Sequence, residues 1–254
     1  MAAESNIKFT CYGKRKAPSY WSFDHFPYVN RLYYIYGGTA FYTSGPVKHQ
    51  LMPGHLYLFP YGIQFAAIHD PADCLDHLYF DFSVVPPLLL DHFVEYKVEE
   101  NTVLYHLLKA IECLLSDNGS LEDEGMIKTL FHGLLDATTR ELDIKRLSDR
   151  RINLVLDVIH EKYNEELTNK SFAELLHMDQ RHFIRIFKQA LNMTPNKYIR
   201  EYRLNLAEAM LRDCVPLYEI AAKTGYQSTT SLCHAFKKSR GLSPSAFQEK
   251  LHEK

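Results

Sequence analysis

The sequence has no long apolar run, and its first residues do not resemble a signal peptide. No stretch of about 18 consecutive apolar residues occurs, so we expect no membrane span. Residues 1–10 are polar and lack the apolar core of a signal peptide. The five cysteines include no C-x-x-C pair, so neither a zinc ribbon nor a disulfide framework is expected. These absences predict a cytoplasmic protein with reduced thiols and no membrane partner.

The familiar catalytic and nucleotide-binding signatures are also missing. There is no G-x-x-x-x-G-K-[ST] phosphate loop, no H-E-x-x-H and no G-x-S-x-G. The sequence has 13 histidines but no H-x-H pair, and His49, His55, His69 and His77 stand singly. We therefore expect no enzymatic activity, no catalytic residues, no cofactor and no metal. A metal-binding barrel enzyme is the alternative, because His and carboxylate side chains from separate strands can cluster.

What the sequence does have is apolar material and an uneven distribution of charge. Apolar residues make up 46% of the 254 residues, which is enough for a packed core. Residues 150–254 hold 17 basic and 12 acidic side chains, whereas residues 1–149 hold 12 basic and 19 acidic ones. This asymmetry predicts two domains, of which the basic C-terminal one suits a polyanionic partner.

The N-terminal part has the pattern of a β domain. Between residue 7 and about residue 85, short stretches rich in Tyr, Phe, Val and Ile alternate with Gly and Pro. Many short strands at this spacing predict a β sandwich or barrel. The clearest candidate strands are 31–36, 39–43, 56–59 and 77–82.

After Pro87 the pattern becomes helical. Residues 102–115 and 126–142 predict two helices separated by a Ser-Asp-Asn-Gly break. Their apolar stripe packs either onto the β domain or against a second copy of the chain, and the sequence leaves both open. The charged residues 141–151 predict a linker. The stripe consists of Val103, Leu107, Ile111, Leu114, Leu115, Ile127, Leu130, Phe131, Leu134 and Leu135.

From Arg151 onward the whole sequence reads as helix. Asp179 and Ser228 are favourable N-caps, and Pro195 suits the first turn of a long helix. Gly225 and Gly241 are stop signals for the helices that precede them. The predicted helices are 152–163, 171–176, 180–191, 195–212, 216–224, one between Ser228 and Gly241, and one from Pro244.

This helical part contains an internal duplication. Each copy reads as a short helix, a tight turn, a second helix, and then a proline that opens another helix. The turn needs a residue that tolerates positive φ, which is Gly225 in the second copy and His177 in the first. The matching pairs are Phe172-Ala173 with Ile220-Ala221, Asp179 with Ser228, Phe183 with Leu232, Phe187-Lys188 with Phe236-Lys237, Pro195 with Pro244, and Tyr198 with Phe247.

Two faces in the same register of a duplicated unit favour a shared function. In the second helix of each copy, Phe183, Ile186 and Phe187, or Leu232, Ala235 and Phe236, are expected to face the core. The long helix 195–212 is about 27 Å long at about 1.5 Å per residue. A spacer of that length can set two helices about one DNA turn apart, near 34 Å.

These residues resemble the AraC/XylS family of bacterial transcription regulators. Arg203-Leu204, Ala207 and Met210-Leu211 follow the family's linker-helix pattern, and Glu219-Ile220-Ala221 with Gly225-Tyr226 follows its second turn. Two positions depart from the family, which usually has Gly at Asn192 and Ser at Asp179. The most specific match is Phe236-Lys237-Lys238, Gly241 and Ser243-Pro244, which follow F-K-K-x-x-G-x-S-P.

The resemblance implies which residues contact DNA. In this family the second helix of each unit reads base edges in the major groove, and flanking lysines bind phosphates. Where the family more commonly has a basic residue, this sequence has His234. The implied base contacts are Arg181, Ile184, Arg185, Thr229, Thr230, Cys233 and His234, and the implied phosphate contacts are Lys188, Lys237 and Lys238.

The N-terminal part resembles the cupin-like sensor domain of the same family. The segment 51–60 follows L-x-P-G-D-L-x-L-x-P, with His55 where Asp is usual. The resemblance implies a small-molecule effector, such as a sugar, held by aromatic faces and a charged clamp. The candidate effector-binding residues are Trp21, Arg31, Tyr33 and Tyr42. It also implies a homodimer formed through 102–142, and contact with RNA polymerase.

We therefore predict an α+β protein with three parts. Residues 1–95 form a cupin-like ligand-sensing barrel or sandwich, 96–148 a helical dimerisation or linker segment, and 149–254 an all-α DNA-binding domain with two helix-turn-helix units joined by a long helix. The predicted function is an effector-responsive transcription activator that binds double-stranded promoter DNA, with repression left open. The alternatives are a cupin-type metal enzyme and a DNA-binding dimer whose barrel binds no ligand.

Overall fold

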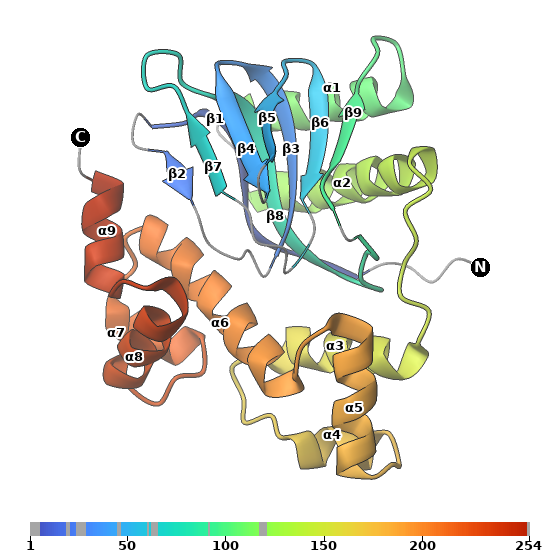
Figure 1. The fold of residues 1–254 in the computed structure, drawn as a ribbon, viewed down its shortest axis with the longest axis vertical. Coiled ribbons are helices and arrows are strands. Elements are labelled where there is room, and N and C mark those ends of the chain that lie inside the picture. Colours follow the sequence, from blue (N-terminus) through green and yellow to red (C-terminus); the bar gives the residue numbers. More distant parts are fainter. Residues whose placement is uncertain are drawn as a thin grey trace. The chain divides into compact units, whose positions relative to one another are not determined.

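The chain folds into two compact units, residues 1–146 and residues 147–254. A computed structural model describes residues 6–18, 21–23, 29–44, 47–59, 61, 66–90, 92–116 and 121–252. Strands lie in the first unit, here called the sheet unit, and the second unit, here called the helical unit, is built from helices (Figure 1). The predicted α+β class is confirmed.

The sheet unit contains two antiparallel sheets. The predicted strands 31–36, 39–43, 56–59 and 77–82 all form, each within a few residues of its predicted bounds. The larger sheet has the order β1 (Asn6–Lys16), β8 (Asp76–Val85), β3 (Asn30–Gly37), β6 (His55–Phe59) and β9 (Val94–Lys97). The smaller sheet has the order β2 (Ser22–Phe23), β7 (Ala66–His69), β4 (Ala40–Ser44) and β5 (Val47–Leu51).

The central strands of the larger sheet, β3 and β8, are buried on both faces. Successive side chains of a strand point to opposite sides, so each set of alternating residues meets a different neighbour. On β3, Tyr33 and Ile35 belong to the cluster that packs against Ala40 and Tyr42 of the smaller sheet. Leu32 and Tyr34, the alternating residues, belong to a second cluster that includes residues of the two helices after the strands. The strand therefore reads as an almost continuous apolar run, as expected of a central strand.

Helices α1 (Val103–Ser116) and α2 (Leu121–Glu141) pack on the outer face of the larger sheet (Figure 1). Phe131 is fully buried there, with its ring centroid 4.3 Å from that of Phe80 and 4.9 Å from that of Phe82. Of the two packing partners that the sequence left open, the apolar stripe takes the sheet. A dimer through this segment would have to use other side chains.

One residue of the predicted stripe is placed wrongly. Val103 is 68% exposed, and the buried positions of α1 are Leu104, Leu108 and Ile111. The side chain of Val103 lies one position, or about 100°, before Leu104 on the helix, which takes it out of the buried face. As the first residue of the helix it also lacks a preceding turn that would cover it.

The end of the sheet unit is held by backbone pairing. The N–H of Leu89 donates to the carbonyl of Lys145 over 2.8 Å, and Leu88 and Arg146 form a β-bridge. The first half of the charged segment 141–151 is thus tied to the chain that follows β8. None of the helices in the described part of the chain is both long and apolar enough to cross a membrane.

The helical unit has the predicted succession of helices, with bounds within about two residues of those expected. The long helix spans the predicted residues, and so does the second helix of the first helix-turn-helix. The helices are α3 (Arg150–Lys162), α4 (Asn169–Leu175), α5 (Gln180–Leu191), α6 (Pro195–Arg212), α7 (Leu217–Lys223), α8 (Thr229–Arg240) and α9 (Pro244–His252).

The backbone repeats the duplication seen in the sequence. The carboxylate of Asp179 accepts from the N–H groups of Arg181 and His182, and the hydroxyl of Ser228 accepts from the N–H of Ser231. Both predicted caps are confirmed. The two turns also have the predicted left-handed backbone, with φ of 51° at His177 and 74° at Gly225. The cap and turn residues thus start α5 and α8 in equivalent ways.

Candidate functional site

Helices α5 and α8 are each anchored by a pair of buried apolar side chains. Phe183 and Phe187 of α5 are fully buried, as are Leu232 and Phe236 of α8. The i, i+4 spacing puts each pair on one face of its helix. Ile186 and Ala235, also predicted to face inward, are partly buried. The opposite face of each helix therefore remains outside the core.

The residues predicted to contact DNA lie on these outer faces. Arg181, Arg185, Thr229, Thr230 and His234 are exposed, whereas Ile184 and Cys233 are partly buried at the margin of the core. The three predicted phosphate-binding lysines, Lys188, Lys237 and Lys238, are exposed as well. Each set draws on both α5 and α8, and the two helices stand in equivalent places of the duplicated fold.

One neighbour of these residues was missed by the sequence reasoning. The guanidinium of Arg185 lies 3.0 Å from Nδ1 of His182, one turn earlier on α5. In the tautomer that carries its proton on Nε2, Nδ1 accepts a hydrogen bond from Nη2 of Arg185. The i, i+3 spacing of a His and an Arg was the available signal. His182 thus holds the Arg185 side chain along the helix surface.

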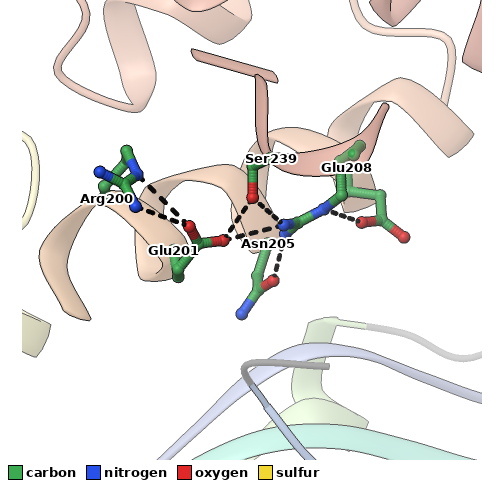
Figure 2. A network of polar contacts seen from close by, with 6 residues as sticks. Arg200, Glu201, Asn205, Glu208 and Ser239 are labelled. Carbon is green, nitrogen blue, oxygen red and sulfur yellow. Dashed lines mark hydrogen bonds and ion pairs between the residues drawn. The ribbon is translucent and has the colours of Figure 1, made fainter. Parts of the chain in front are cut away.

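A buried arginine at the C-terminal end of α8, Arg240, contacts three residues of α6. Figure 2 shows three of its partners, Glu201, Asn205 and Glu208, together with Ser239. Nη1 of Arg240 lies 2.9 Å from Oε2 of Glu201, and its Nε lies 3.0 Å from Oε2 of Glu208. Its Nη2 donates to Oδ1 of Asn205 over 2.7 Å, and Nη1 also donates to the hydroxyl of Ser239. We call Arg240, Glu201, Asn205, Glu208 and Ser239 the Arg240 network.

The Arg240 network is almost fully removed from solvent. The side chain of Arg240 is 4% exposed, and those of Glu201 and Glu208 are 2% and 7% exposed. Burial acts to lower the pKa of Arg240, but Glu208 and Glu201 outweigh it, so that the pKa is raised. A buried charge-assisted cluster of this kind fixes geometry, because Arg240 cannot turn away without leaving its own buried charge unpaired.

Arg200 and Arg212 complete the charge balance of the network. Each lies on α6 and is more exposed than Arg240, and Arg200 contacts Glu201 whereas Arg212 contacts Glu208. Sequence reasoning missed the network altogether. The signal was present: Glu201, Asn205 and Glu208 occur at i, i+4 and i+7 in a helix whose other buried positions are mostly apolar.

The predicted effector residues lie between the two sheets. Trp21, Tyr33 and Tyr42 all belong to one cluster, in which the rings of Tyr33 and Tyr42 lie 5.4 Å and 5.2 Å from that of Phe59. Arg31 was predicted as a charged clamp. Its Nε lies 2.9 Å from Oδ1 of Asp81, and both side chains are 6% exposed. The charge of Arg31 is therefore already balanced within the sheet.

His77 is a functional candidate that sequence reasoning treated as an isolated residue. Its ring lies 4.9 Å from that of Tyr33, 5.4 Å from that of Tyr79 and 6.2 Å from that of Trp21. The residue is 1% exposed, and its Nδ1 has no hydrogen-bond partner among the described residues. Burial, aided by the charge of Arg15, lowers its pKa from 6.5 to about 3. The ring is thus neutral at physiological pH.

Other acceptors and donors line the same side of β8. His77, Tyr79, Asp81 and Ser83 alternate along the strand, so their side chains share one face. The hydroxyl of Ser83 is also buried without a partner in the described structure. The described residues contain no group of three or more His, Cys, Asp or Glu side chains placed to hold a metal ion.

Comparison with known proteins shows that the helical unit is similar to helix-turn-helix domains. A helix-turn-helix domain family matches residues 172–250. An uncharacterized HTH-type transcriptional regulator of Haemophilus influenzae is 30% identical over 127 residues, which cover 50% of this chain and 43% of that protein. The RCS-specific HTH-type transcriptional activator RclR of Escherichia coli is 28% identical over 104 residues, covering 41% of this chain and 37% of RclR. The chain thus spans less than half the length of these relatives.

The likeness to solved structures extends over both units. An apo form of a ToxT variant from Vibrio cholerae superposes with a TM-score of 0.63 at 12% identity, over 98% of each chain. ToxT with an unsaturated fatty acid bound gives a TM-score of 0.60 at 12% identity, over 96% of this chain and 94% of that one. At this identity the shared property is the fold, a strand-rich domain followed by a helix-turn-helix domain.

Replacing Arg240 tests what the Arg240 network contributes. Arg240→Met removes the buried partner that Glu201 and Glu208 share and leaves them only the more exposed Arg200 and Arg212, so the free energy of unfolding of the helical unit should fall by about 3 kcal/mol. Adding Glu208→Gln should recover part of that loss, because one buried charge without its buried partner is removed. Urea denaturation followed by far-UV circular dichroism measures the change. Arg151→Met, at an exposed ion pair with Asp149, is the control and should cost under about 1 kcal/mol. A loss equally small for Arg240→Met would contradict the account.

The depressed pKa of His77 predicts a pH-dependent stability. Because the folded-state pKa lies below the unfolded value of 6.5, the unfolded chain binds a proton that the folded chain does not as pH falls from 6.5 toward 3. The contribution of neutral His77 to the free energy of unfolding is therefore complete above pH 6.5 and falls by about 1.4 kcal/mol for each pH unit below it.

His77→Phe keeps the ring but removes the titration. Fluorescence of Trp21, the single tryptophan, follows unfolding of the sheet unit in urea. Between pH 7 and pH 5 the wild-type chain should lose about 2 kcal/mol more stability than the variant. Parallel pH profiles for the two proteins would show that His77 does not titrate in this way.

Proposed function

We propose that this chain, whose helical half belongs to the AraC/XylS family of helix-turn-helix proteins, is a transcription regulator that reads duplex DNA with α5 and α8. The observation that carries the proposal is the duplication. The second helix of each helix-turn-helix unit, α5 or α8, has a matching cap, matching buried apolar side chains and a matching outward face. Helix-turn-helix proteins place such helices in the major groove. The curated relatives bear the names of transcription regulators.

The proposed division of labour follows the chemistry of the exposed side chains. Arg185 can donate two parallel hydrogen bonds to O6 and N7 of guanine, after its contact with His182 is released. Lysines supply affinity for phosphates without reading sequence. The proposed base-reading residues are Arg181, Ile184, Arg185, Thr229, Thr230, Cys233 and His234, and the proposed phosphate-binding residues are Lys188, Lys237 and Lys238.

Helix α6 sets the separation of the two reading helices. Its 18 residues extend about 27 Å, and the two ends adjoin the first and the second helix-turn-helix. A separation near 34 Å brings two such helices into successive major grooves on one face of the duplex. We infer a bipartite target whose two parts lie about one turn apart.

The sheet unit is proposed to bind a small-molecule effector between its sheets. The support is the aromatic cluster of Trp21, Tyr33 and Tyr42, together with the unpartnered Nδ1 of His77. ToxT, which shares the fold, has been crystallised with an unsaturated fatty acid. Because Arg31 is balanced by Asp81 and His77 is neutral, an uncharged ligand with an O–H or N–H donor fits this interior better than a carboxylate.

A second candidate is a barrel that binds no ligand and serves only assembly. Tyr42 is 1% exposed and Tyr33 is 5% exposed, which is the burial expected of core residues. In either case we propose a homodimeric, non-enzymatic regulator that acts in the cytoplasm. Activation through contact with RNA polymerase is the proposed mode, in line with the name of RclR as an activator.

Two substitutions distinguish base reading from phosphate binding. Arg185→Ala should relax preference at one base position, with a loss of about 1–3 kcal/mol on the preferred sequence only. Lys238→Ala should weaken binding evenly on all sequences and reduce the slope of log K against log salt by about 1. Binding to a randomised duplex library at several salt concentrations measures both. Equal losses on every sequence for Arg185→Ala would remove it from the base-reading set.

A ligand screen distinguishes a sensing barrel from an assembly barrel. An effector present at about 100 times its Kd should stabilise the sheet unit by about 2.7 kcal/mol, seen as a raised Tm by Trp21 fluorescence. Sugars and other neutral polyols should raise the Tm more than fatty or aromatic acids do, and His77→Phe should abolish the shift. Absence of a shift with every compound would favour the assembly barrel, whereas a shift with acids alone would contradict the neutral ligand.

A further inference from the structure

Arg203, on α6, connects parts of the helical unit that are far apart in the sequence. Its Nε donates to the carbonyl of Tyr163 over 2.6 Å and its Nη2 to the carbonyl of Glu165 over 2.7 Å. Its Nη1 donates to the carbonyl of Gly225 over 3.2 Å. The first two carbonyls follow α3, and the third lies in the turn of the second helix-turn-helix. We call Arg203, the segment 163–165 and Gly225 the Arg203 lock.

The same two segments touch directly at Gly225. A Cβ added there would lie 2.6 Å from the carbonyl oxygen of Asn164 and 2.7 Å from its Cα. Those atoms belong to the backbone, so they cannot move aside as a flexible side chain can. Gly225 also has a φ of 74°, which side-chain-bearing residues rarely adopt. The turn of the second helix-turn-helix therefore lies against the segment after α3 with no room for a side chain.

The chemistry of Arg203 suits a structural connection. Its hydrogen bonds in the described structure go to neutral backbone carbonyls and not to a carboxylate. Two of those carbonyls lie just after the C-terminal end of α3. The dipole and the last carbonyls of a helix attract a cation to that end. A guanidinium has five donors in a fixed plane and can serve three acceptors at once, whereas an ammonium group cannot match that geometry.

The lock gives the two helix-turn-helix units a second connection besides α6. Helix α3 packs with α5, so the segment after α3 moves with the first unit. Gly225 lies between α7 and α8 and moves with the second unit. A single connecting helix can bend and twist along its length. A second tie, away from the helix axis, removes that freedom.

We propose that Arg203 is a positioning residue that fixes the distance and angle between α5 and α8, and so selects which separation of two DNA half-sites the protein accepts. The inference rests on the proposed DNA-binding function. Arg203 does not have to touch DNA for this role. Its effect is on the tolerance for half-site spacing, which neither a base contact nor a phosphate contact controls.

The test measures binding to duplexes in which the two preferred half-sites are moved apart or together in single base-pair steps. Two inserted base pairs rotate the second half-site by about 70° and shift it by about 7 Å. Wild-type affinity should then fall about tenfold or more. For Arg203→Ala and Arg203→Lys the same insertion should change affinity by less than about threefold, while affinity for a single half-site stays as in the wild type.

Arg151→Ala is the matched control, because it removes the same charge from the same unit at a side chain that is 51% exposed and lies outside both the Arg203 lock and the Arg240 network. It should keep the wild-type spacing preference. If both Arg203 variants also keep that preference, or if the wild-type chain has none, the lock does not set spacing. Arg203→Lys keeps the positive charge. A spacing tolerance shared by both Arg203 variants therefore reports the lost hydrogen-bond geometry and not a lost attraction to DNA.

A measurement without DNA keeps this inference separate from the proposed function. Nitroxide labels at Lys188→Cys and Lys237→Cys, in a chain whose own five cysteines are replaced by serine, report the distance between α5 and α8. The distance distribution should be narrow with Arg203 and broad with Arg203→Ala. Failure of the wild-type chain to bind any preferred sequence would overturn the proposed function alone. Equal widths of the two distributions would overturn the lock alone.

Discussion

The burial of Arg240 between Glu201 and Glu208 is the interaction on which the geometry of the helical unit depends. It joins the last residue of α8 to the middle of α6 at a depth where an unpaired charge would be costly. Phe236 and Leu232 supply the apolar contact of α8, but an apolar face alone tolerates sliding and rotation. The ionic contact specifies one orientation. The outer face of α8, with Thr229, Thr230 and His234, is presented at an angle that this contact defines.

The sheet unit differs in that it encloses polar groups between its two sheets. The larger sheet is covered by α1 and α2 on one side and by the smaller sheet on the other. On this second side, Arg31, His77 and Asp81 are buried. The Arg31–Asp81 pair removes net charge from that interior. What remains is an aromatic wall with a neutral imidazole whose Nδ1 has no described partner. An uncharged molecule is the ligand that we propose for this interior, and DNA phosphates are the partners that we propose for the exposed lysines of the helical unit.

Local rules made the helical unit predictable. Asp179, Ser228 and Pro195 mark helix starts through hydrogen bonds or ring geometry that involve only neighbouring residues, and the positive φ of His177 follows from its place in a duplicated turn. The strands were predictable because Gly and Pro bound them. Contacts between distant segments were not: Arg240 with Glu201, Arg203 with Tyr163 and His77 with Trp21 depend on how helices and strands cross. Val103 was misplaced because one helical position decides burial at the end of a stripe. The contacts of the proposed DNA-reading residues follow from family resemblance and stay predictions.

The most direct test of the account is capture of genomic DNA fragments by the purified chain, with binding repeated at several salt concentrations. Two reading helices held by one long helix predict an enriched motif of two parts whose centres lie about one turn, or about 10–10.5 base pairs, apart. Affinity for that motif should fall steeply with salt, as expected when lysines displace counterions from phosphates. Enrichment of a motif with one part only, or binding without any preferred sequence at low salt, would contradict the claim that α5 and α8 read DNA together.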